Sequence, residues 1–128
     1  MKGLVLAIMA AAVSVGAATG SMDPLAVGGD VYKKVFENGQ VRVMEVTFAP
    51  GATIGMHTHP DHFAYVISGG KLRITNEAGK VTDADLAVGQ VLWIDAESHK
   101  AENTGTTTVK VLVTELKGRK TKKKAAAK

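Results

Sequence analysis

Short runs in which hydrophobic and polar residues alternate cover most of this chain. In residues 71–75, for example, Leu72 and Ile74 alternate with charged and polar residues. A period of two is typical of a β-strand with one buried face. Similar short runs, many of them rich in valine, occupy residues 31–37, 41–48, 53–59, 62–68, 81–88, 91–94, 99–103 and 107–116. The pattern predicts about nine short strands, with residues 91–94 as a buried one.

Turn residues separate these runs. Asn38-Gly39 favours the positive φ angles of a two-residue hairpin turn, and residues 49–51 and 76–79 form further turns. After Gly20 no segment shows a 3.6-residue hydrophobic period long enough for a secure helix. Short strands without long helices predict an all-β sandwich or barrel.

The two ends of the chain differ from its middle. Lys2 is followed by an uncharged run of apolar and small residues up to Ala18, which predicts a signal peptide over residues 1–18 and a periplasmic or secreted protein. An uncleaved anchor or a buried N-terminal helix is the alternative. Residues 19–30 are expected to be a linker, residues 31–116 the domain, and residues 117–128 a basic, disordered tail.

The charge and the composition narrow the range of partners. The formal net charge is +4, but residues 117–128 hold seven basic residues and no acid, whereas residues 19–116 hold eight basic and twelve acidic residues. The domain therefore has no basic face, and no nucleic-acid partner is expected. The tail could make a weak contact with an anionic surface at low salt. The absence of cysteine excludes disulfides and thiolate-bound zinc.

The candidate chemistry lies in the histidines. His57, His59 and His62 fall within six residues, and His99 follows about forty residues later. On a strand His57 and His59 would point to one side, about 7 Å apart, where both could reach one ion. Neutral imidazole is the commonest metal ligand in proteins. The spacing therefore predicts a metal site on a β scaffold.

Two motifs around these histidines resemble those of the cupin family. In the first, five residues separate Gly51 from His57-Thr-His59, and Gly69 closes the motif. Six residues separate that glycine from a position that usually holds a glutamate in cupins, and here that position holds His62. The resemblance is to the motif pattern Gly, five residues, His-x-His, then Glu and Gly.

The second motif begins at Gly89 and ends with His99, three residues and Asn103. Asp95 and Glu97 stand where cupins usually have Pro and Gly, and both are expected in a solvated loop. The surrounding sequence is most similar to small single-domain cupins, some of which carry the name of beta-alanine degradation proteins.

This resemblance implies a double-stranded β-helix, or jelly-roll barrel, over residues 31–116. It implies one divalent transition metal bound by His57, His59, His62 and His99. Such an all-nitrogen, neutral set suits Fe, Mn, Ni, Cu, Co or Zn. The residues expected in or beside the pocket for a small-molecule ligand are Ala64, Trp93 and Asn103, with Asn103 as a turn or supporting hydrogen-bond residue.

Three functions are open from the sequence. The first is an enzyme, dioxygenase-like or isomerase-like, that uses oxygen-dependent or Lewis-acid chemistry on a small organic acid. The second is a non-enzymatic periplasmic module that binds a metal or a small ligand. The third is a metal-free structural barrel. The resemblance also implies a homodimer that forms through residues 31–48.

Overall fold

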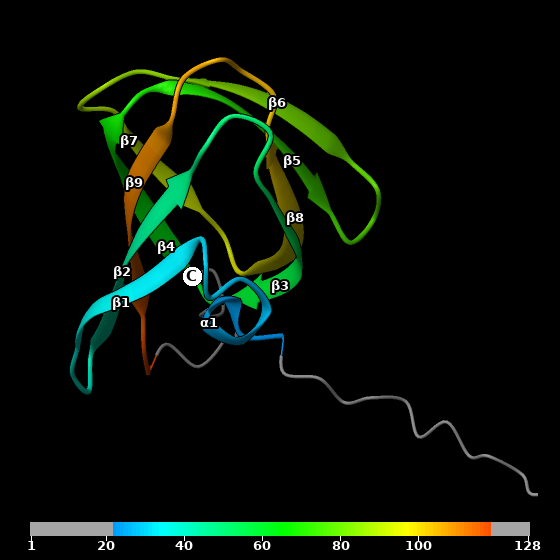
Figure 1. The fold of residues 1–128 in the computed structure, drawn as a ribbon. Helices are drawn as coiled ribbons and strands as arrows, with labels where there is room; N and C mark the ends of the chain where they lie inside the picture. The colour runs from blue at the N-terminus through cyan, green and yellow to red at the C-terminus, as the bar shows by residue number, and fades with distance from the viewer. Residues whose placement is uncertain (1–21, 119–128) are drawn as a thin grey trace, which may run out of the picture.

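The protein folds into two antiparallel β-sheets that face each other, as the computed structural model of residues 22–118 shows (Figure 1). One sheet has the strand order β1-β2-β9-β4-β7, and the other has the order β3-β8-β5-β6. The strands are β1 (Tyr32–Glu37), β2 (Val41–Phe48), β3 (Thr53–His59), β4 (His62–Ser68), β5 (Gly70–Asn76), β6 (Val81–Leu86), β7 (Val91–Ile94), β8 (Glu97–Asn103) and β9 (Val109–Leu116). The predicted all-β jelly-roll fold is confirmed.

The strand boundaries follow the alternation in the sequence closely. β2, β3, β4 and β7 begin and end where the pattern predicted. Three strands differ by two residues at one end: β6 ends at Leu86 rather than Val88, β9 begins at Val109 rather than Thr107, and β8 begins at Glu97 rather than His99. The expectation that Asp95 and Glu97 share a loop is therefore wrong for Glu97, because Glu97 pairs with His59 across β3 and β8.

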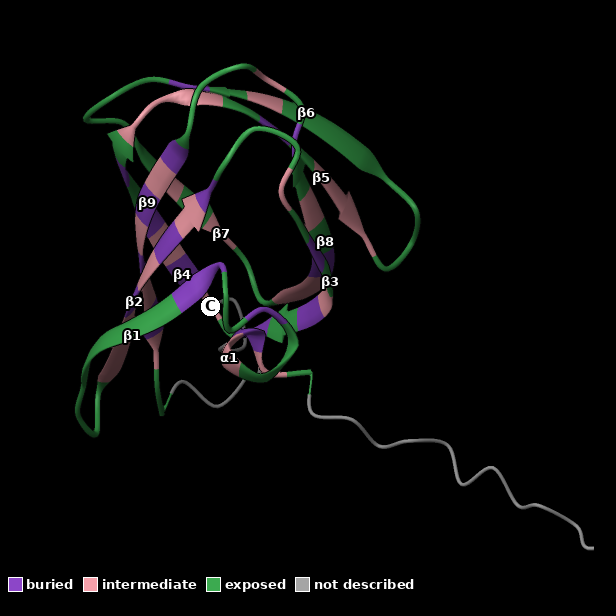
Figure 2. Cartoon of the chain, in the orientation of Figure 1, coloured by how far each residue is buried: buried purple, intermediate pink, exposed green. Residues whose placement is uncertain are grey.

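Alternation also decides which face of each strand is buried (Figure 2). In β4, His62, Ala64 and Val66 are buried, whereas Tyr65 and Ile67 are exposed. β2 adds Met44, Val46 and Phe48 to the core, and β9 adds three valines. The other buried hydrophobic residues of the core are Val31, Tyr32, Ile54, Leu72 and Leu86. Period-two burial of this kind is what a sheet with one solvated face requires.

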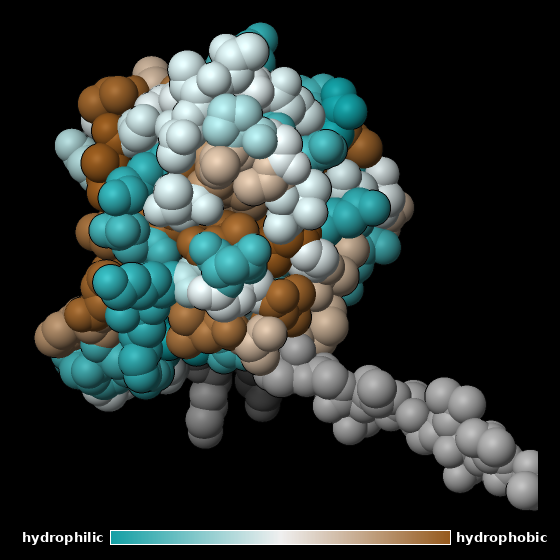
Figure 3. Space-filling model, viewed as in Figure 1, coloured by the Kyte–Doolittle hydropathy of each residue, from teal (hydrophilic) through white to brown (hydrophobic). Residues whose placement is uncertain are grey.

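β7 is only half-buried, so its expected burial is wrong. Val91 and Trp93 are 62% and 52% exposed, and they pair with Tyr65 and Phe63 of β4 on the outer face of the five-stranded sheet. Hydrophobic surface lies along this side of the molecule (Figure 3). At the other edge of the same sheet Phe36 is exposed, on the strand through which the homodimer would form. The homodimer remains a prediction.

The first hairpin turns by a different mechanism from the predicted one. Neither Asn38 nor Gly39 has a positive φ angle. Instead the side-chain oxygen of Asn38 accepts hydrogen bonds from the backbone N–H groups of Gln40 and Val41, each over 2.8 Å. The asparagine side chain therefore closes the turn in the manner of an Asx turn. Positive φ angles occur at Gly51 and Gly79, where β-turn geometry favours glycine.

The described part of the predicted linker packs against the barrel. Residues Pro24–Val27 form a one-turn helix, α1, and Asp23 caps it by accepting a hydrogen bond from the backbone N–H of Leu25. The backbone oxygen of Met22 accepts from the N–H of Thr58 in β3 over 2.7 Å. A side chain at Gly28 would collide with Ile54, so this segment lies close against β3.

The predicted signal peptide and nearly all of the predicted basic tail lie outside the described residues. Within residues 22–118, no helix has the length and apolar character needed to cross a bilayer.

Candidate metal centre

All four histidines of the chain meet in the interior of the barrel. β3 supplies His57 and His59, β4 supplies His62, and β8 supplies His99. Their exposed fractions lie between 0% and 6%. His57 and His99 are directly opposite each other in the pairing of β3 with β8, which is why residues distant in sequence come together.

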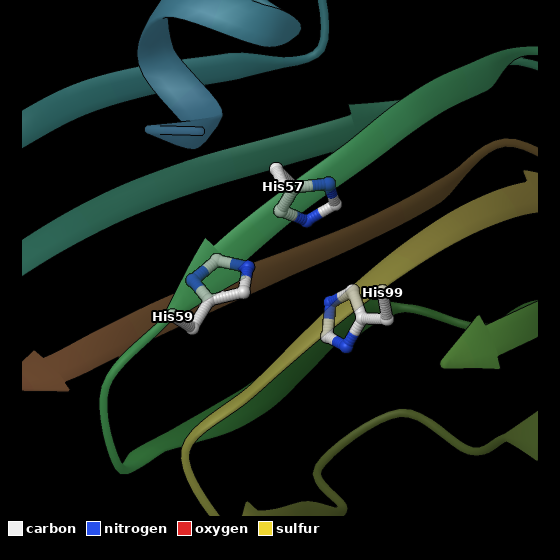
Figure 4. A group of neighbouring side chains, drawn as sticks. All are labelled: His57, His59 and His99. Carbon is white, nitrogen blue, oxygen red and sulfur yellow. The ribbon is translucent and has the colours of Figure 1, made fainter. Parts of the chain in front are cut away.

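Three of these histidines form a compact group (Figure 4). One ring nitrogen from each of His57, His59 and His99 lies within 4.8 Å of the others. The ring centroid of His57 is 4.8 Å from that of His59 and 4.8 Å from that of His99. Three imidazoles at this spacing could hold a single metal ion, which would leave further coordination positions for a ligand.

His62 lies at the side of this group. Its ring centroid is 4.4 Å from that of His59 but 6.2 Å from that of His99. It does not belong to the compact three-histidine group. The structure thus brings His62 into the cluster, and its role as a fourth ligand remains a prediction.

Two of the histidines are oriented by backbone carbonyls. Nδ1 of His57 bonds to the carbonyl oxygen of Gly55 over 2.8 Å, and Nδ1 of His62 bonds to that of Pro60 over 2.8 Å. A carbonyl oxygen only accepts, so Nδ1 must carry the proton in both rings. Nε2 is then unprotonated and has a lone pair available for a metal ion.

The other two histidines are oriented by carboxylates. Nδ1 of His59 bonds to Oε2 of Glu115 over 2.6 Å, and Nδ1 of His99 bonds to Oε2 of Glu97 over 2.6 Å. A carboxylate that accepts a hydrogen bond from Nδ1 fixes the orientation of the ring and makes Nε2 a stronger lone-pair donor to a metal ion. The expectation that Glu97 belongs to a solvated loop is therefore wrong.

Glu115 connects His59 to the N-terminal segment. It is 3% exposed, and its Oε1 accepts a hydrogen bond from Nε of Arg42 over 2.7 Å. Arg42 donates from Nη1 to Oδ2 of Asp23, again over 2.7 Å. Burial raises the pKa of Glu115, but the hydrogen bonds from His59 and Arg42 outweigh burial and leave that pKa below its usual value. Glu115 is therefore ionised near neutral pH.

The sequence motifs gave no indication of Glu115, Arg42 or Tyr32. Tyr32 is 6% exposed, and its hydroxyl oxygen lies 3.4 Å from Nε2 of His57 and 3.3 Å from Nε2 of His59. Burial raises the pKa of Tyr32 well above its usual value, and the charge of Glu115 raises it further, so its hydroxyl stays protonated. The only sequence signal was its position at the start of the first strand, beside Val31.

Burial also decides the charge of His57, His62 and His99. It lowers the pKa of His57 to about 4 and the pKa of His62 to about 4, and neighbouring histidines add to the effect. The pKa of His99 is lowered by burial as well, in spite of its bond to Glu97. These rings are neutral at pH 7, which is the form that binds metal.

The donor set fits a divalent transition metal. Three imidazoles with supporting partners on Nδ1 are typical of Zn, Cu, Fe, Ni or Co sites, and Mn is compatible. The carboxylates of Asp61 and Glu102 are not part of the cluster, since Asp61 accepts from the N–H of Ala96 and Glu102 lies on the exposed face of β8. The acidic groups that do contact the cluster, Glu115 and Glu97, reach it through Nδ1 atoms.

A cavity of about 260 Å³ adjoins the cluster between the two sheets. Tyr32, His62, His99 and Glu97 contribute to its lining, and none of the lysines and arginines in the part of the chain that the structure describes does. The other lining residues are aliphatic or aromatic apart from Thr82; they are Val46, Phe48, Ala64, Leu72, Ile74, Ala84, Leu86, Leu92, Trp93, Ile94, Ala101, Val111 and Val113. The space therefore suits a small, mainly apolar molecule with one polar end at the histidines.

The structure separates the three residues expected at the pocket. Ala64 and Trp93 line the cavity, although Trp93 is half-exposed and its indole N–H donates to Oδ1 of Asp95 over 2.8 Å. Asn103 does not line it. Its side-chain amide donates to the carbonyl oxygens of Phe48 and Thr107, and its oxygen accepts from the N–H of Gly105. Asn103 is thus a buried turn residue that ties β8 to β2.

Comparison with known protein families agrees with this arrangement. A family model described as a cupin domain matches residues 44–115. The chain belongs to the cupin family. The match runs from Met44 within β2 to Glu115 within β9 and thus contains every histidine of the cluster, whereas Tyr32 and Asp23 precede it. A search of curated proteins finds no match to this cupin.

Solved structures show the same fold. A cupin domain from Bordetella pertussis Tohama I is 24% identical, with a TM-score of 0.63 over 68% of this chain and 92% of that one. A double-stranded β-helix protein from Klebsiella pneumoniae is 24% identical, with a TM-score of 0.58 over 70% and 77%. A predicted oxalate decarboxylase from Thermotoga maritima is 22% identical, with a TM-score of 0.52 over 66% and 77%. At these identities the likeness is one of fold.

Proposed function

We propose that this cupin binds one divalent transition metal through His57, His59 and His99, and that its cavity receives a small organic ligand that reaches the metal. The observation that carries the proposal is the orientation of the three rings. Each Nδ1 is hydrogen-bonded to an acceptor, which leaves the lone pair of each Nε2 free to bind a metal ion. The three rings lie close enough together for their nitrogen atoms to share one ion. Histidines buried only to fill a core have no reason to share this arrangement.

Metal content tests the proposal directly. The purified chain is stripped with a chelator, loaded in turn with Zn, Co, Mn and Fe, desalted, and analysed by mass spectrometry. We expect about one ion per chain in the wild type and at least a hundredfold weaker binding in His57→Ala and His59→Ala. Thr58→Ala is the matched control, because Thr58 lies between the two histidines on the opposite face of β3 and bonds to Ser98. A wild type that stays metal-free after loading would contradict the proposal and favour a structural barrel.

The ligand set can be refined by a further substitution. If His62 is a fourth ligand, His62→Ala should weaken metal binding as strongly as His99→Ala does. If His62 only lines the cavity, the loss should be smaller than about tenfold. The comparison of the two variants thus decides between a three-histidine and a four-histidine centre.

The cavity narrows the ligand class to a small monoacid or another molecule with a single polar group. Because no lysine or arginine among residues 22–118 lines the cavity, a second carboxylate away from the metal would have no cationic partner among these residues. This argues against a longer dicarboxylate whose second carboxylate cannot reach the metal. A divalent metal held at the cluster would act as a Lewis acid on the oxygen of the bound molecule.

Enzyme and binding module remain two forms of this proposal. Glu97 favours the enzyme, because this carboxylate both lines the cavity and contacts a metal-site histidine. Oxygen consumption and product formation are measured with metal-loaded protein and a panel of small monoacids, dicarbonyls and catechols, with His99→Ala as the inactive control. Turnover that His99→Ala abolishes supports the enzyme. Saturable binding without turnover supports the module.

Export and dimer formation are further parts of the proposal. Mass spectrometry of protein isolated from its native host should find a mature N-terminus near Thr19. Light scattering at tens of micromolar should find twice the mass of one chain. An intact Met1 or a monomer would contradict these two proposals without affecting the metal site.

A further inference from the structure

We propose that the Tyr32 hydroxyl is a ligand-positioning group of the metal centre: it donates a hydrogen bond to an oxygen atom of the molecule that binds the metal. The inference rests on the proposed metal site. It assigns a role to a residue that lies outside both histidine motifs and before the matched family region.

The first step is the position of the hydroxyl group. Tyr32 begins β1, the strand at the edge of the five-stranded sheet, and its side chain reaches inward to the facing sheet. Its oxygen lies 3.4 Å from Nε2 of His57 and 3.3 Å from Nε2 of His59. These are the two nitrogen atoms that would face the metal, so the hydroxyl lies at the edge of the coordination sphere.

The second step concerns the single proton of the hydroxyl. Nδ1 of His57 donates to a carbonyl and Nδ1 of His59 to a carboxylate, so both Nε2 atoms are acceptors. The hydroxyl can satisfy one of them at a time. A metal ion would take both lone pairs and leave the Tyr32 proton without either of its acceptors. A buried donor without a partner is rare in native proteins because it is costly.

The third step identifies the new acceptor. Tyr32 lines the same cavity as His99 and His62. No described side chain other than the two histidines is hydrogen-bonded to its hydroxyl. A molecule that enters the cavity and binds the metal through oxygen would place a lone pair beside the phenol. The site should therefore favour oxygen donors that accept a hydrogen bond, such as a carboxylate, over nitrogen donors that cannot.

The test compares two probes of the Co(II)-loaded protein, acetate and imidazole, by visible absorption. Acetate keeps free lone pairs after it binds the metal, whereas imidazole has none at its bound nitrogen. In Tyr32→Phe we expect acetate affinity to fall about tenfold and imidazole affinity to change less than about twofold. Co(II) affinity should stay within about threefold of wild type. Tyr65→Phe is the matched control, since Tyr65 is the other tyrosine and lies on the outer face of β4.

Several results would overturn the proposal. Equal acetate affinity in wild type and Tyr32→Phe would overturn it while leaving the metal site intact. Loss of Co(II) to the extent seen in His57→Ala would make Tyr32 a direct metal ligand instead. Failure of the wild type to bind Co(II) would overturn both this inference and the proposed function.

A second measurement holds even if Tyr32→Phe does not fold. In Tyr65→Phe, Tyr32 is the only tyrosine of the chain. Addition of acetate to the Co(II)-loaded variant should then produce a tyrosine difference spectrum in the near ultraviolet that imidazole does not produce. The absence of that difference at saturating acetate would overturn the inference.

Discussion

The two halves of the histidine cluster are supported in different ways. His57 and His62 donate to carbonyl oxygens two residues earlier in the chain. His59 and His99 donate to the carboxylates of Glu115 and Glu97. A carbonyl sets the tautomer but adds no charge, whereas a carboxylate also strengthens the donor nitrogen. The first half is therefore supported by local backbone geometry, and the second half depends on side chains that can be substituted.

The largest effect is expected from Glu115→Ala. This change leaves the Arg42 guanidinium and the His59 Nδ1–H without their buried partner, so we expect a loss of about 3 kcal/mol in unfolding free energy. Metal affinity should fall about 10- to 100-fold. Urea unfolding and metal titration measure the two effects. Unchanged affinity would show that the carboxylate does not support His59.

His57 and His62, the two histidines bonded to carbonyl oxygens, make the stability of the metal-free protein depend on pH. The pKa values of His57 and His62 are about 4 in the folded chain, below the ordinary histidine value near 6.5. Between these values the unfolded chain binds more protons, so stability is complete above about pH 6.5 and is lost as the pH falls towards 4. We expect the melting temperature to drop by more than about 5 °C from pH 7 to pH 4.5. Calorimetry after chelator treatment would show whether the drop occurs and whether His62→Ala reduces it.

Glu97→Ala should separate metal affinity from stability. Glu97 has a side chain that is 32% exposed, so its removal leaves no buried charge unpaired. We expect metal affinity about tenfold below wild type and a change of less than about 1 kcal/mol in unfolding free energy. A stability loss equal to that of Glu115→Ala would remove the distinction between a buried and a half-exposed carboxylate support.

The smallest effect is expected from Asp23→Ala, at the outer end of the series of contacts from α1 to His59. Asp23 is 38% exposed and caps a helix of one turn. Its loss should cost about 1 kcal/mol and change metal affinity by less than about threefold. Chemical denaturation and a cobalt titration of the same sample measure both values. A tenfold loss of affinity would mean that Asp23 holds Arg42 in place for Glu115.

Much of the fold and the histidine group could be predicted from the sequence. Period-two alternation identifies the strands, and the His57-Thr-His59 spacing puts two rings on one face. The support of these rings could not be predicted. Glu115 is 56 residues from the histidine it contacts, and its position in an alternating strand does not distinguish a buried carboxylate from an exposed one. Tyr32 reaches the centre from the opposite sheet, and that contact depends on the packing of two sheets.

The contacts around His59 also bear on the order in which the molecule is made. Its supports come from near the two ends of the described chain, with Asp23 and Arg42 at one end and Glu115 at the other. A growing polypeptide that has not yet emerged through β9 lacks the carboxylate that orients this ring. Metal capture should therefore follow completion of the whole barrel, and bound metal would then raise its free energy of unfolding by mass action. A pulse of metal during synthesis would thus report the moment at which the barrel closes.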